Sequence, residues 1–427
     1  MKVCNFFSKI CKICIDNPNA FFKTVILLQV FLVIDRIFVT KILNYGLLMR
    51  FDTTKTLGIL GGGQLGKMLV QAAMEFDIYI KSMDPDSSAP CATYAHEFVC
   101  ASLLDYEKVI QFGLSCDIIT IEIEHVNVDA LDYLASIGKK VYPQPSVLRT
   151  IQNKRIQKEF FVEHHIPTAD FKRVTEDLAL SISQFPVVQK AETGGYDGKG
   201  VQVLRSIEDL PKALPGDTFI ETLVPFEKEL AVIVARSASG EIRTFPVVEM
   251  VFHPEANLVE YLFAPAMVSE QTSAKAQEIA KKVAHDMEIV GLLAVEMFLL
   301  PDGEILVNEC APRPHNSGHQ TMRANHTSQF EQHIRAILDL PLGDSDSFIP
   351  AAMVNILGED GYIGTPIYEG MDQLLAKAGI HPFLYGKKIT KPFRKMGHVT
   401  ITGKNIEELK EKVDLVKNHL RVISHQK

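Results

Sequence analysis

The chain has 427 residues, of which 47% are hydrophobic and 22% are charged, and its formal net charge is −8. This length is enough for about three domains, and the composition is ordinary for a globular protein. The acidic balance argues against a general nucleic-acid binder and against a protein drawn to acidic membranes. An anionic ligand must therefore be held by a local basic site.

The seven cysteines are scattered along the chain. Their odd number, without a repeated spacing, argues against a disulfide framework. Cys11 and Cys14 form one C-x-x-C pair, but no second pair or nearby histidine completes a zinc site in the sequence. We therefore predict reduced thiols and a cytoplasmic location.

The first 48 residues are rich in Phe, Ile and Cys and join no later pattern. Their apolar core, residues 24–34, is shorter than the roughly twenty residues that span a bilayer. No small-residue cleavage site follows it, as a signal peptide would require. We interpret residues 1–48 as a non-functional extension or a misassigned start, with Met49 as the natural beginning. A membrane-associating or targeting segment is the alternative.

From residue 56 onward, short apolar runs alternate with amphipathic stretches. The pattern predicts strands in TLGILGG, YIKSMD, CDIITIEIE and KVYPQP, and helices in QLGKMLVQAAMEF, LDYEKVIQFGL and VDALDYLASIG. This alternating order predicts a parallel, helix-covered sheet that ends near residue 150.

The glycines at 61, 63 and 66 in this region fit G-x-G-x-x-G, a turn that cradles phosphate between a strand and a helix. Asp84 follows about twenty residues later, where a dinucleotide site has a carboxylate for the ribose. This pattern alone indicates a nicotinamide-dependent oxidoreductase, a hypothesis that the rest of the chain must support.

The stretch PVVQKAETGGYDGKGVQVL reads as two strands joined by a loop with four glycines between Thr193 and Gly200. Glycines let backbone N–H groups approach a polyphosphate closely. Because no helix follows, the loop is neither a Walker A turn nor a dinucleotide turn. Lys190 and Lys154 are candidates for phosphate contact. An ordinary hairpin turn and a surface lysine are the alternatives.

Two further glutamates, Glu221 and Glu229, lie in FIETLVPFEKEL around Pro225. A carboxylate can bind ribose hydroxyl groups, and the backbone of residues 221–224 could pair with an adenine edge. Each signal is weak by itself, because most glutamates are simply solvated.

The stretch LLAVEMFLLPDGEILVNECAP predicts a hairpin with Asp302 and Gly303 at its tip. A two-residue turn would place Glu296 directly opposite Glu309, with Cβ atoms about 5 Å apart. Two such carboxylates with the Asn308 amide suit Mg²⁺, which prefers oxygen ligands. An exposed pair is the alternative, although the apolar flanks place these strands in a core. A dehydrogenase needs no such metal site.

Two polar clusters follow the hairpin. APRPHNSGHQT, residues 311–321, lacks the ligand spacing of a zinc site and better suits a phosphorylated, hydroxyl-rich small molecule. The second cluster could clamp a phosphate or a carboxylate, or be a solvated basic strand. It consists of Lys387, Lys388, Lys391, Arg394 and Lys395.

The motifs GILGGGQLGKM, TIEIEHV, TGGYDGKG, PFEKELAVIVAR, NECAPRPHNSGH and RKMGH occur in this order over residues 56–400. They resemble the ATP-grasp superfamily, and specifically the 5-(carboxyamino)imidazole ribonucleotide synthases. The resemblance implies an α/β plus α+β fold. Its expected parts are a Rossmann-like domain at 49–150, a glycine-loop lid at 151–240, a metal subdomain at 241–345 and an antiparallel-sheet C-terminal domain at 346–427.

The resemblance also implies an activity in purine biosynthesis. ATP and bicarbonate would form carboxyphosphate, whose carboxyl group passes to the amine of 5-aminoimidazole ribonucleotide. ATP and Mg²⁺ (or Mn²⁺) would be the cofactors of a cytoplasmic homodimer without nucleic-acid or membrane partners.

Family positions carry over to this chain residue by residue. The resemblance assigns the ATP phosphates to Lys154, Lys190, Gly194, Gly195 and Gly198, the adenine to Glu221, Thr222, Leu223 and Val224, the ribose to Glu229, and the metal to Glu296 and Glu309. It places Tyr196, Asp197 and Lys395 around bicarbonate and the carboxylated product. It assigns the ribonucleotide pocket to Gly63, Gln64, Leu65, Glu122, Arg313, His315, Asn316, Lys387 and Arg394.

The first 48 residues have no counterpart in the family, and within the matching stretches the chain departs from it at two places. Relatives often carry an arginine shortly before GGYDGKG, where this chain has Ala191, Glu192 and Thr193, and they commonly have serine where Ala231 stands. Alternatives are a sister ATP-grasp enzyme that uses formate on glycinamide ribonucleotide, an NAD-dependent oxidoreductase, and a non-catalytic nucleotide-binding regulator. Because the candidate ATP-binding residues lie elsewhere in the chain, we interpret the turn at 61–66 as a substrate-side loop. We interpret Asp84 as an ordinary strand-end residue.

Overall fold

The computed structural model describes residues 52–174, 182, 184–194, 200–253 and 258–425. Residues from Thr53 onward form one compact unit. The extension at 1–48 lies outside the described residues, as do Gly195, Tyr196, Asp197 and Gly198 of the glycine loop. None of the described helices is long and apolar enough to cross a membrane.

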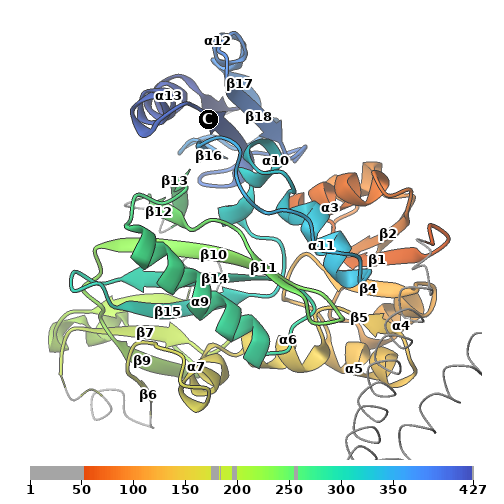
Figure 1. The fold of residues 1–427 in the computed structure, drawn as a ribbon, viewed down its shortest axis with the longest axis horizontal. Coiled ribbons are helices and arrows are strands. Elements are labelled where there is room, and N and C mark those ends of the chain that lie inside the picture. The colour runs from red at the N-terminus through yellow and green to blue at the C-terminus, as the bar shows by residue number, and fades with distance from the viewer. Residues whose placement is uncertain (1–51, 175–181, 183, 195–199, 254–257, 426–427) are drawn as a thin grey trace, which may run out of the picture. The chain divides into compact units, whose positions relative to one another are not determined.

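The first part of this unit is the predicted parallel sheet, with strand order β3-β2-β1-β4-β5. Figure 1 labels its strands β2, β1, β4 and β5. Its strands are β1 (Thr56–Leu60), β2 (Tyr79–Asp84), β3 (Glu97–Cys100), β4 (Ile118–Ile121) and β5 (Lys140–Val141). Its helices are α3 (Gln64–Met74), α4 (Tyr106–Leu114) and α5 (Val128–Ser136), with the short η1 (Pro90–Thr93) before β3. The edge strand β3 was not predicted. Strand β4 ends at Ile121, earlier than predicted, so Glu122 follows the strand at the sheet's carboxyl edge.

Two helices lead from this sheet to the next part of the chain. They are α6 (Pro145–Gln152) and α7 (Lys154–Glu163), which meet at Asn153. The side chain of Asn153 accepts a hydrogen bond from Ile156 N, as an N-cap residue does. Lys154 is therefore the first residue of α7, at the junction between the helices.

The glycine-loop region forms a separate four-stranded antiparallel sheet with order β6-β9-β7-β8. Its strands are β6 (Phe171–Arg173), β7 (Val187–Ala191), β8 (Val201–Leu204) and β9 (Thr218–Thr222), with η2 (Ile207–Lys212) after β8. Strands β7 and β8 flank the glycine loop and pair with each other, as the sequence predicts.

A larger antiparallel sheet, of nine strands among the described residues, forms the centre of the molecule. Its order is β15-β14-β10-β12-β13-β16-β19-β18, with β11 paired to β10. The strands are β10 (Lys228–Arg236), β11 (Ile242–Thr244), β12 (Val248–Phe252), β13 (Val259–Ala264), β14 (Gly291–Leu299), β15 (Ile305–Ala311), β16 (Ala351–Leu357), β18 (Ile380–Leu384) and β19 (Lys395–Thr402). This sheet continues across the expected domain boundaries near 240 and 345.

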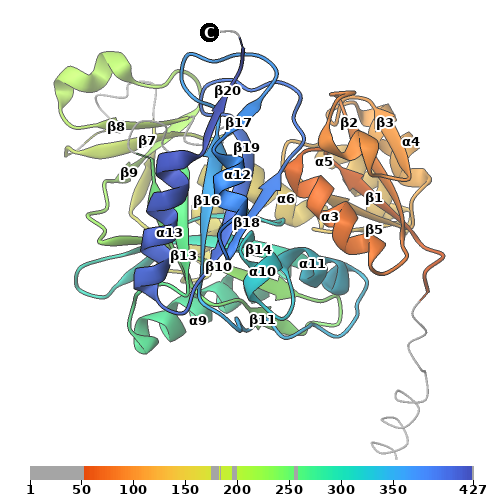
Figure 2. The ribbon, with the colours of Figure 1, turned by 90° about the horizontal axis from the view of Figure 1, so that it is seen from above.

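The remaining elements complete the C-terminal half of the chain. They are η3 (Asn316–Gly318), α10 (Thr321–Ala324), α11 (Gln329–Ile337), α12 (Met371–Leu375), α13 (Ile406–His419) and the paired strands β17 (Ile367–Glu369) and β20 (Arg421–Ile423). Helix α13 packs on β16 and β19 through Leu409, Val413 and Val416 (Figure 2).

Helix α9 (Glu270–Asp286) covers one face of β10 and β14 (Figure 1). Its small residues, such as Ala280, pack against Val232 and Val295 in the main hydrophobic core. Because neighbouring residues along a strand alternate between faces, Glu296 and Phe298 lie on the opposite face of the sheet. The face that α9 leaves uncovered therefore carries the polar residues of the site.

Buried histidines in this fold predict a loss of stability in acid. Burial lowers the pKa of His333 to about 3, while its Nε2 contacts Thr120 Oγ1 at 2.8 Å. An unfolded histidine has a pKa of about 6.5, so the unfolded chain gains a proton that the folded chain refuses. Stability should therefore fall as pH decreases from about 6.5 toward 3.

We predict that His333→Gln reduces the dependence of the free energy of unfolding on pH by about 1.4 kcal/mol per pH unit. Urea unfolding of both proteins at several values between pH 7 and pH 4.5 measures it. Parallel curves for the two proteins would contradict the prediction.

Candidate active site

The glycine turn at residues 61–66 is closed by the chain's own carboxylates. Gly63 N and Gly66 N donate to Glu122 at 3.0 and 2.9 Å, and Gly62 N donates to Asp84 at 2.7 Å. Backbone N–H groups at a helix N-terminus are where a bound phosphate usually sits. Here the Glu122 side chain holds these groups. The interpretation of Asp84 as an ordinary strand-end residue is wrong, because its carboxylate holds the turn.

The glycine spacing provides room for Glu122. Gly61 has a φ of 103°, and a Cβ built on it would lie 2.4 Å from Glu122 Cγ. A Cβ on Gly63 would lie 2.8 Å from Glu122 Oε1. Burial raises the pKa of Glu122, while the two N–H groups and the charge of Arg313 oppose that shift. Side chains at these glycines would collide with the carboxylate that completes the turn.

The residues after the glycines lie in different environments. Gln64 begins α3 and is half-buried, whereas the side chain of Leu65 packs into the hydrophobic core of this domain. A contact between Leu65 and a substrate would therefore have to come from its backbone. The predicted role of Gln64 stays a prediction.

Glu296 on β14 pairs with Glu309 on β15, as the sequence predicts. The ladder pairs Met297 with Val307 and then Glu296 with Glu309, so Asn308 is the extra residue of a β-bulge. In a regular ladder, Glu309 would lie on the same face as Val307, which packs in the core with α9. The bulge instead turns Glu309 to the face of Glu296.

The hairpin tip differs from the two-residue turn that we expected. Leu299 pairs with Ile305, and Leu300 N donates to Glu304 O, so residues 301–303 form a three-residue tip. Gly303 has a φ of 86°, which suits the left-handed position of such a loop. The third loop residue and the bulge offset each other, and the predicted pairing is right although the predicted turn is wrong.

The two carboxylates of this pair differ in their electrostatics. Burial raises the pKa of Glu296, and the nearby charges of Glu309 and Glu229 raise it further. Burial also disfavours the charged form of Glu309, but Lys154 and Lys190 outweigh it and hold that pKa below its usual range. One member of the pair therefore keeps its negative charge more readily than the other.

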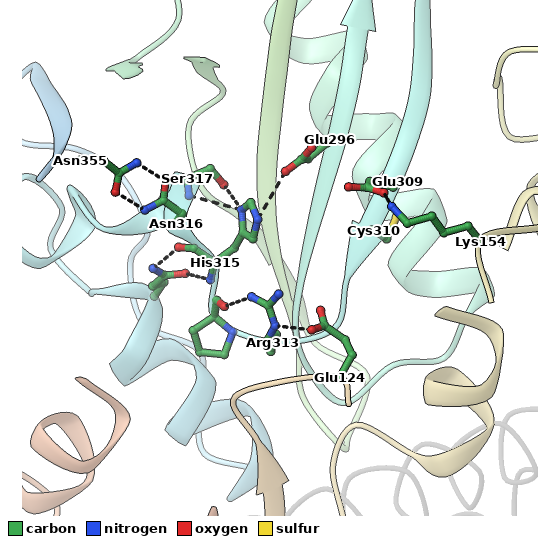
Figure 3. A network of polar contacts seen from close by, with 12 residues as sticks. Glu124, Lys154, Glu296, Glu309, Cys310, Arg313, His315, Asn316, Ser317 and Asn355 are labelled. Carbon is green, nitrogen blue, oxygen red and sulfur yellow. Dashed lines mark hydrogen bonds and ion pairs between the residues drawn. The ribbon is translucent and has the colours of Figure 1, made fainter. Parts of the chain in front are cut away.

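Nitrogen-bearing side chains approach the pair from two sides (Figure 3). Lys154 Nζ forms an ion pair with Glu309, from the start of α7. His315 Nε2 lies 3.4 Å from Glu296 Oε1. Lys395, the first residue of β19, also acts on Glu296 and lowers its pKa. The structure thus brings five of the predicted residues to one place: Lys154, Glu296, Glu309, His315 and Lys395.

A buried ion cluster connects the four-stranded sheet β6-β9-β7-β8, called the lid sheet below, to the nine-stranded central sheet. Glu221, on β9, lies 2.8 Å from Lys190 Nζ and 3.0 Å from Lys158 Nζ. Lys190 also donates to Asn308 Oδ1 at 2.9 Å, and Lys158 donates to Thr168 Oγ1 at 2.7 Å. The side chain of Glu221 is thus committed to two lysines, and its backbone lies in the ladders that β9 forms with β6 and β7. Sequence reasoning missed Lys158, whose partners are distant in the sequence.

The rest of the expected adenine segment consists of Thr222, which ends β9, and the two residues after it. Thr222 N donates to Asp170 O, and Val224 O accepts from Phe226 N at 3.0 Å. Thr222 is exposed, and Leu223 and Val224 are half-buried. The segment is accessible, and its contact with adenine stays a prediction.

Glu229 lies beside an aromatic surface. It pairs with Phe298 on β14, and Phe298 stacks on Phe226 with ring centroids 4.8 Å apart and planes 11° apart. Burial and the charge of Glu309 raise the pKa of Glu229 to about 7. Sequence reasoning missed Phe298, although its position two residues after Glu296 puts it on the same face.

The polar loop after β15 is held in place by contacts from three other segments (Figure 3). Arg313 Nε lies 2.9 Å from Glu124 Oε2, in the segment after β4. The Asn316 and Asn355 amides donate to each other at 2.9 Å in both directions. Gln329 accepts from His315 N at 2.9 Å and donates to its carbonyl at 2.7 Å. The side-chain amide of Asn316 is therefore already committed to Asn355.

The basic residues near β19 divide into two groups. Lys387 and Arg394 are half-buried and fold back onto the backbone: Lys387 donates to Lys395 O at 2.8 Å and Arg394 to Ile389 O at 2.7 Å. Lys388 and Lys391 are exposed. The half-buried group is the better candidate for a phosphate clamp.

Gly194 lies in the glycine loop and is the last described residue before position 195, with a φ of 78°. A Cβ built on it would meet nothing within 4 Å. The expected contacts of Gly195, Tyr196, Asp197 and Gly198 fall outside the described residues.

Comparison with known proteins matches three families along the chain. Residues 54–152 match the ribonucleotide synthetase preATP-grasp domain, residues 159–330 the ATP-grasp domain, and residues 351–412 the phosphoribosylaminoimidazole carboxylase C-terminal domain. N5-carboxyaminoimidazole ribonucleotide synthase from Bacillus subtilis is 40% identical over 353 residues, which make up 81% of this chain and 90% of the relative. The chain belongs to the N5-carboxyaminoimidazole ribonucleotide synthase family.

Solved structures of this family agree with the fold. The synthetase from Thermotoga maritima has a TM-score of 0.82 and 44% identity, covering 87% of this chain and 100% of that one. The synthase from Aspergillus clavatus, in complex with ADP and 5-aminoimidazole ribonucleotide, has a TM-score of 0.78 and 33% identity, covering 86% and 98%. As a member of this ATP-grasp family, the chain is an ATP-dependent ligase that forms a C–N bond.

Longer relatives also match. Plant and yeast proteins called phosphoribosylaminoimidazole carboxylase are 37% and 38% identical, and the chain spans 66% of the length of each. The likeness to the synthase family therefore concerns one part of those longer proteins.

The contact between Gly61 and Glu122 predicts an effect on stability. Gly61→Ala adds a side chain at positive φ and a collision with Glu122, so we expect a loss of more than about 1 kcal/mol. Gly138→Ala is the matched control, because Gly138 has a φ of 90° and nothing within 4 Å of its Cβ position. Urea unfolding of both variants measures the difference, and equal losses would contradict a steric role for Glu122.

Proposed function

We propose that this chain carboxylates 5-aminoimidazole ribonucleotide in purine biosynthesis, as members of its family do, with ATP and bicarbonate as co-substrates. A bicarbonate oxygen attacks the γ-phosphorus, and ADP leaves, which yields carboxyphosphate. The exocyclic amine then attacks the carboxyl carbon, phosphate leaves, and the amine loses a proton. The observation that carries the proposal is the opposed pair Glu296 and Glu309, which lies between the lysines of the lid side and the basic residues near β19.

The carboxylate pair fits a bound Mg²⁺, with Mn²⁺ as an alternative. The donors are hard oxygens on one face of a sheet, and like charges so close are destabilising without a cation. Among the described residues, no group of three or more His, Cys, Asp or Glu side chains is arranged to hold a metal. Glu296 and Glu309 would therefore be the protein's share of the ligands. A bound Mg²⁺ neutralises charge on the phosphates of ATP.

The chain's own residues would orient the nucleotide. Lys154 and Lys190 would hold the phosphates, since both approach Glu309 and neither lies far from the metal position. Glu229 would bind the ribose, and the ring of Phe298 offers an apolar surface beside it. Residues 221–224 would present their backbone to the adenine.

The ribonucleotide would lie on the other side of the pair. Arg313, Lys387 and Arg394 supply positive charge for its phosphate, and His315 stands between that side and Glu296. Lys395 lies near Glu296, where it would stabilise negative charge on the bicarbonate or the carboxylated product. Because carboxyphosphate hydrolyses readily, this chemistry requires that the site exclude water.

An oxidoreductase is disfavoured by the glycine turn. The backbone N–H groups that would bind a pyrophosphate instead bind Glu122 and Asp84. A non-catalytic regulator is disfavoured by the intact carboxylate pair with its lysines. The homodimer and the cytoplasmic location remain predictions, and light scattering of the purified protein tests the first.

The substrate assignment predicts how ADP release depends on the co-substrates. With Mg·ATP present, ADP release should rise strongly when both 5-aminoimidazole ribonucleotide and bicarbonate are added. A coupled ADP assay on the purified chain measures this. Release that does not respond to the ribonucleotide would overturn the assignment, and oxidation of added NADH would revive the oxidoreductase.

The metal assignment predicts that Glu309→Gln abolishes ADP formation. Removing a metal-binding charge from such a site costs several kcal/mol of transition-state stabilisation, so we expect a loss of more than about 100-fold. Glu304→Gln on the same hairpin is the matched control, because Glu304 is exposed and pairs with Lys275 at 3.6 Å. Circular dichroism checks the fold of both variants, and near-normal turnover of Glu309→Gln would refute the metal role.

A further inference from the structure

Glu192 directly follows β7 and precedes the glycine loop. Its carboxylate is buried and accepts hydrogen bonds from Asn153 Nδ2 at 3.0 Å and Arg155 Nε at 2.8 Å. Asn153 and Arg155 are the two neighbours of Lys154. The carbonyl oxygen of Glu192 accepts from Lys154 N at 2.8 Å. Glu192, next to the lid sheet, thus holds residues 153–155 at the start of α7.

The start of α7 depends on these contacts. Asn153 caps the helix through its Oδ1, which accepts from Ile156 N at 3.0 Å, and Glu192 anchors the other end of the same amide. Glu192 N donates in turn to Asp217 O at 3.0 Å, just before β9. First turns of helices have unpaired N–H groups and fray easily. A lysine in the first turn of a helix, such as Lys154, keeps a fixed position only where hydrogen bonds hold its backbone.

We propose that Glu192 is a positioning residue for ATP, which clamps the root of Lys154 so that its ammonium group stays beside Glu309 and the phosphates. The inference rests on the proposed role of Lys154 in phosphate binding. It goes beyond that role because Glu192 would act indirectly, through the backbone of Lys154 and the side chains of its two neighbours.

The charges of the cluster support the proposal. Arg155 is shared between Glu192 at 2.8 Å and Glu159, which lies one helical turn further along α7. The Glu192 side chain is 8% exposed, whereas that of Glu159 is 54% exposed. Burial alone would raise the pKa of Glu192, but the hydrogen bonds from Asn153 and Arg155 keep it below its usual value. A charged, buried carboxylate is a strong acceptor for the clamp.

The test compares Glu192→Gln with the matched control Glu159→Gln. The control removes the carboxylate of Glu159, which is the other ion-pair partner of Arg155. We expect Glu192→Gln to raise the KM for Mg·ATP and the Kd for ADP about tenfold, since small misplacements of a positioning group have effects of this size. The KM for 5-aminoimidazole ribonucleotide should stay within about twofold, and Glu159→Gln should match the parent protein.

A double-mutant cycle separates positioning from general stability. Lys154→Met alone should raise the KM for Mg·ATP, and adding Glu192→Gln should raise it no further, because the clamp would have nothing left to place. A structural effect would instead add to that of Lys154→Met. Arg155→Met, which removes one arm of the clamp, is the second variant if Glu192→Gln does not fold.

The outcomes distinguish the two levels of inference. If Lys154→Met weakens ATP use but Glu192→Gln and Arg155→Met do not, the clamp is overturned and the proposed function stands. If Glu192→Gln raises the KM for both substrates alike, its role is structural and the proposal is also overturned. If Lys154→Met itself leaves the KM for Mg·ATP unchanged, the proposed role of Lys154 and the clamp fail together.

Discussion

The opposed carboxylates Glu296 and Glu309 are the constraint on which the surrounding structure depends. Two like charges on neighbouring strands are unfavourable in a partly buried site, and nitrogen-bearing side chains gather around them. Lys154 pairs with Glu309, and His315 lies 3.4 Å from Glu296. These groups come from segments far apart in the sequence, and both segments contact the carboxylate pair.

The same compensation recurs away from the pair. Glu221 is buried between Lys158 and Lys190, and Glu122 receives two backbone N–H groups at the start of α3. Because an unpaired buried carboxylate is costly, each of these contacts also determines where a loop or a helix end can lie. The glycine turn at residues 61–66 shows this most directly. Its glycine spacing is typical of phosphate binding, but its N–H groups donate to the Glu122 carboxylate instead. Glu192 applies the same chemistry to the first turn of α7.

Sequence reasoning succeeded where short-range periodicity determines structure. The parallel first sheet, the hairpin around the glycine loop and the pairing of Glu296 with Glu309 are confirmed. It failed where one residue changes the geometry or a distant partner decides a role. The two-residue turn was wrong because a third loop residue and a bulge at Asn308 offset each other, and a bulge leaves no compositional trace. The role of Asp84 was not predicted, because its partner Gly62 follows a different strand, 22 residues earlier in the sequence.

The sequence by itself determined the family, the order of the elements and most of the residue types that the chemistry needs, because these follow from motifs and from local periodicity. Tertiary structure decided which of those side chains are available. It committed Asn316 to Asn355 and the Glu221 carboxylate to two lysines, and it brought to the site Lys158 and Phe298, which sequence reasoning missed. The physical reason is that a buried polar group must find a partner, and that partner is chosen by packing between distant segments.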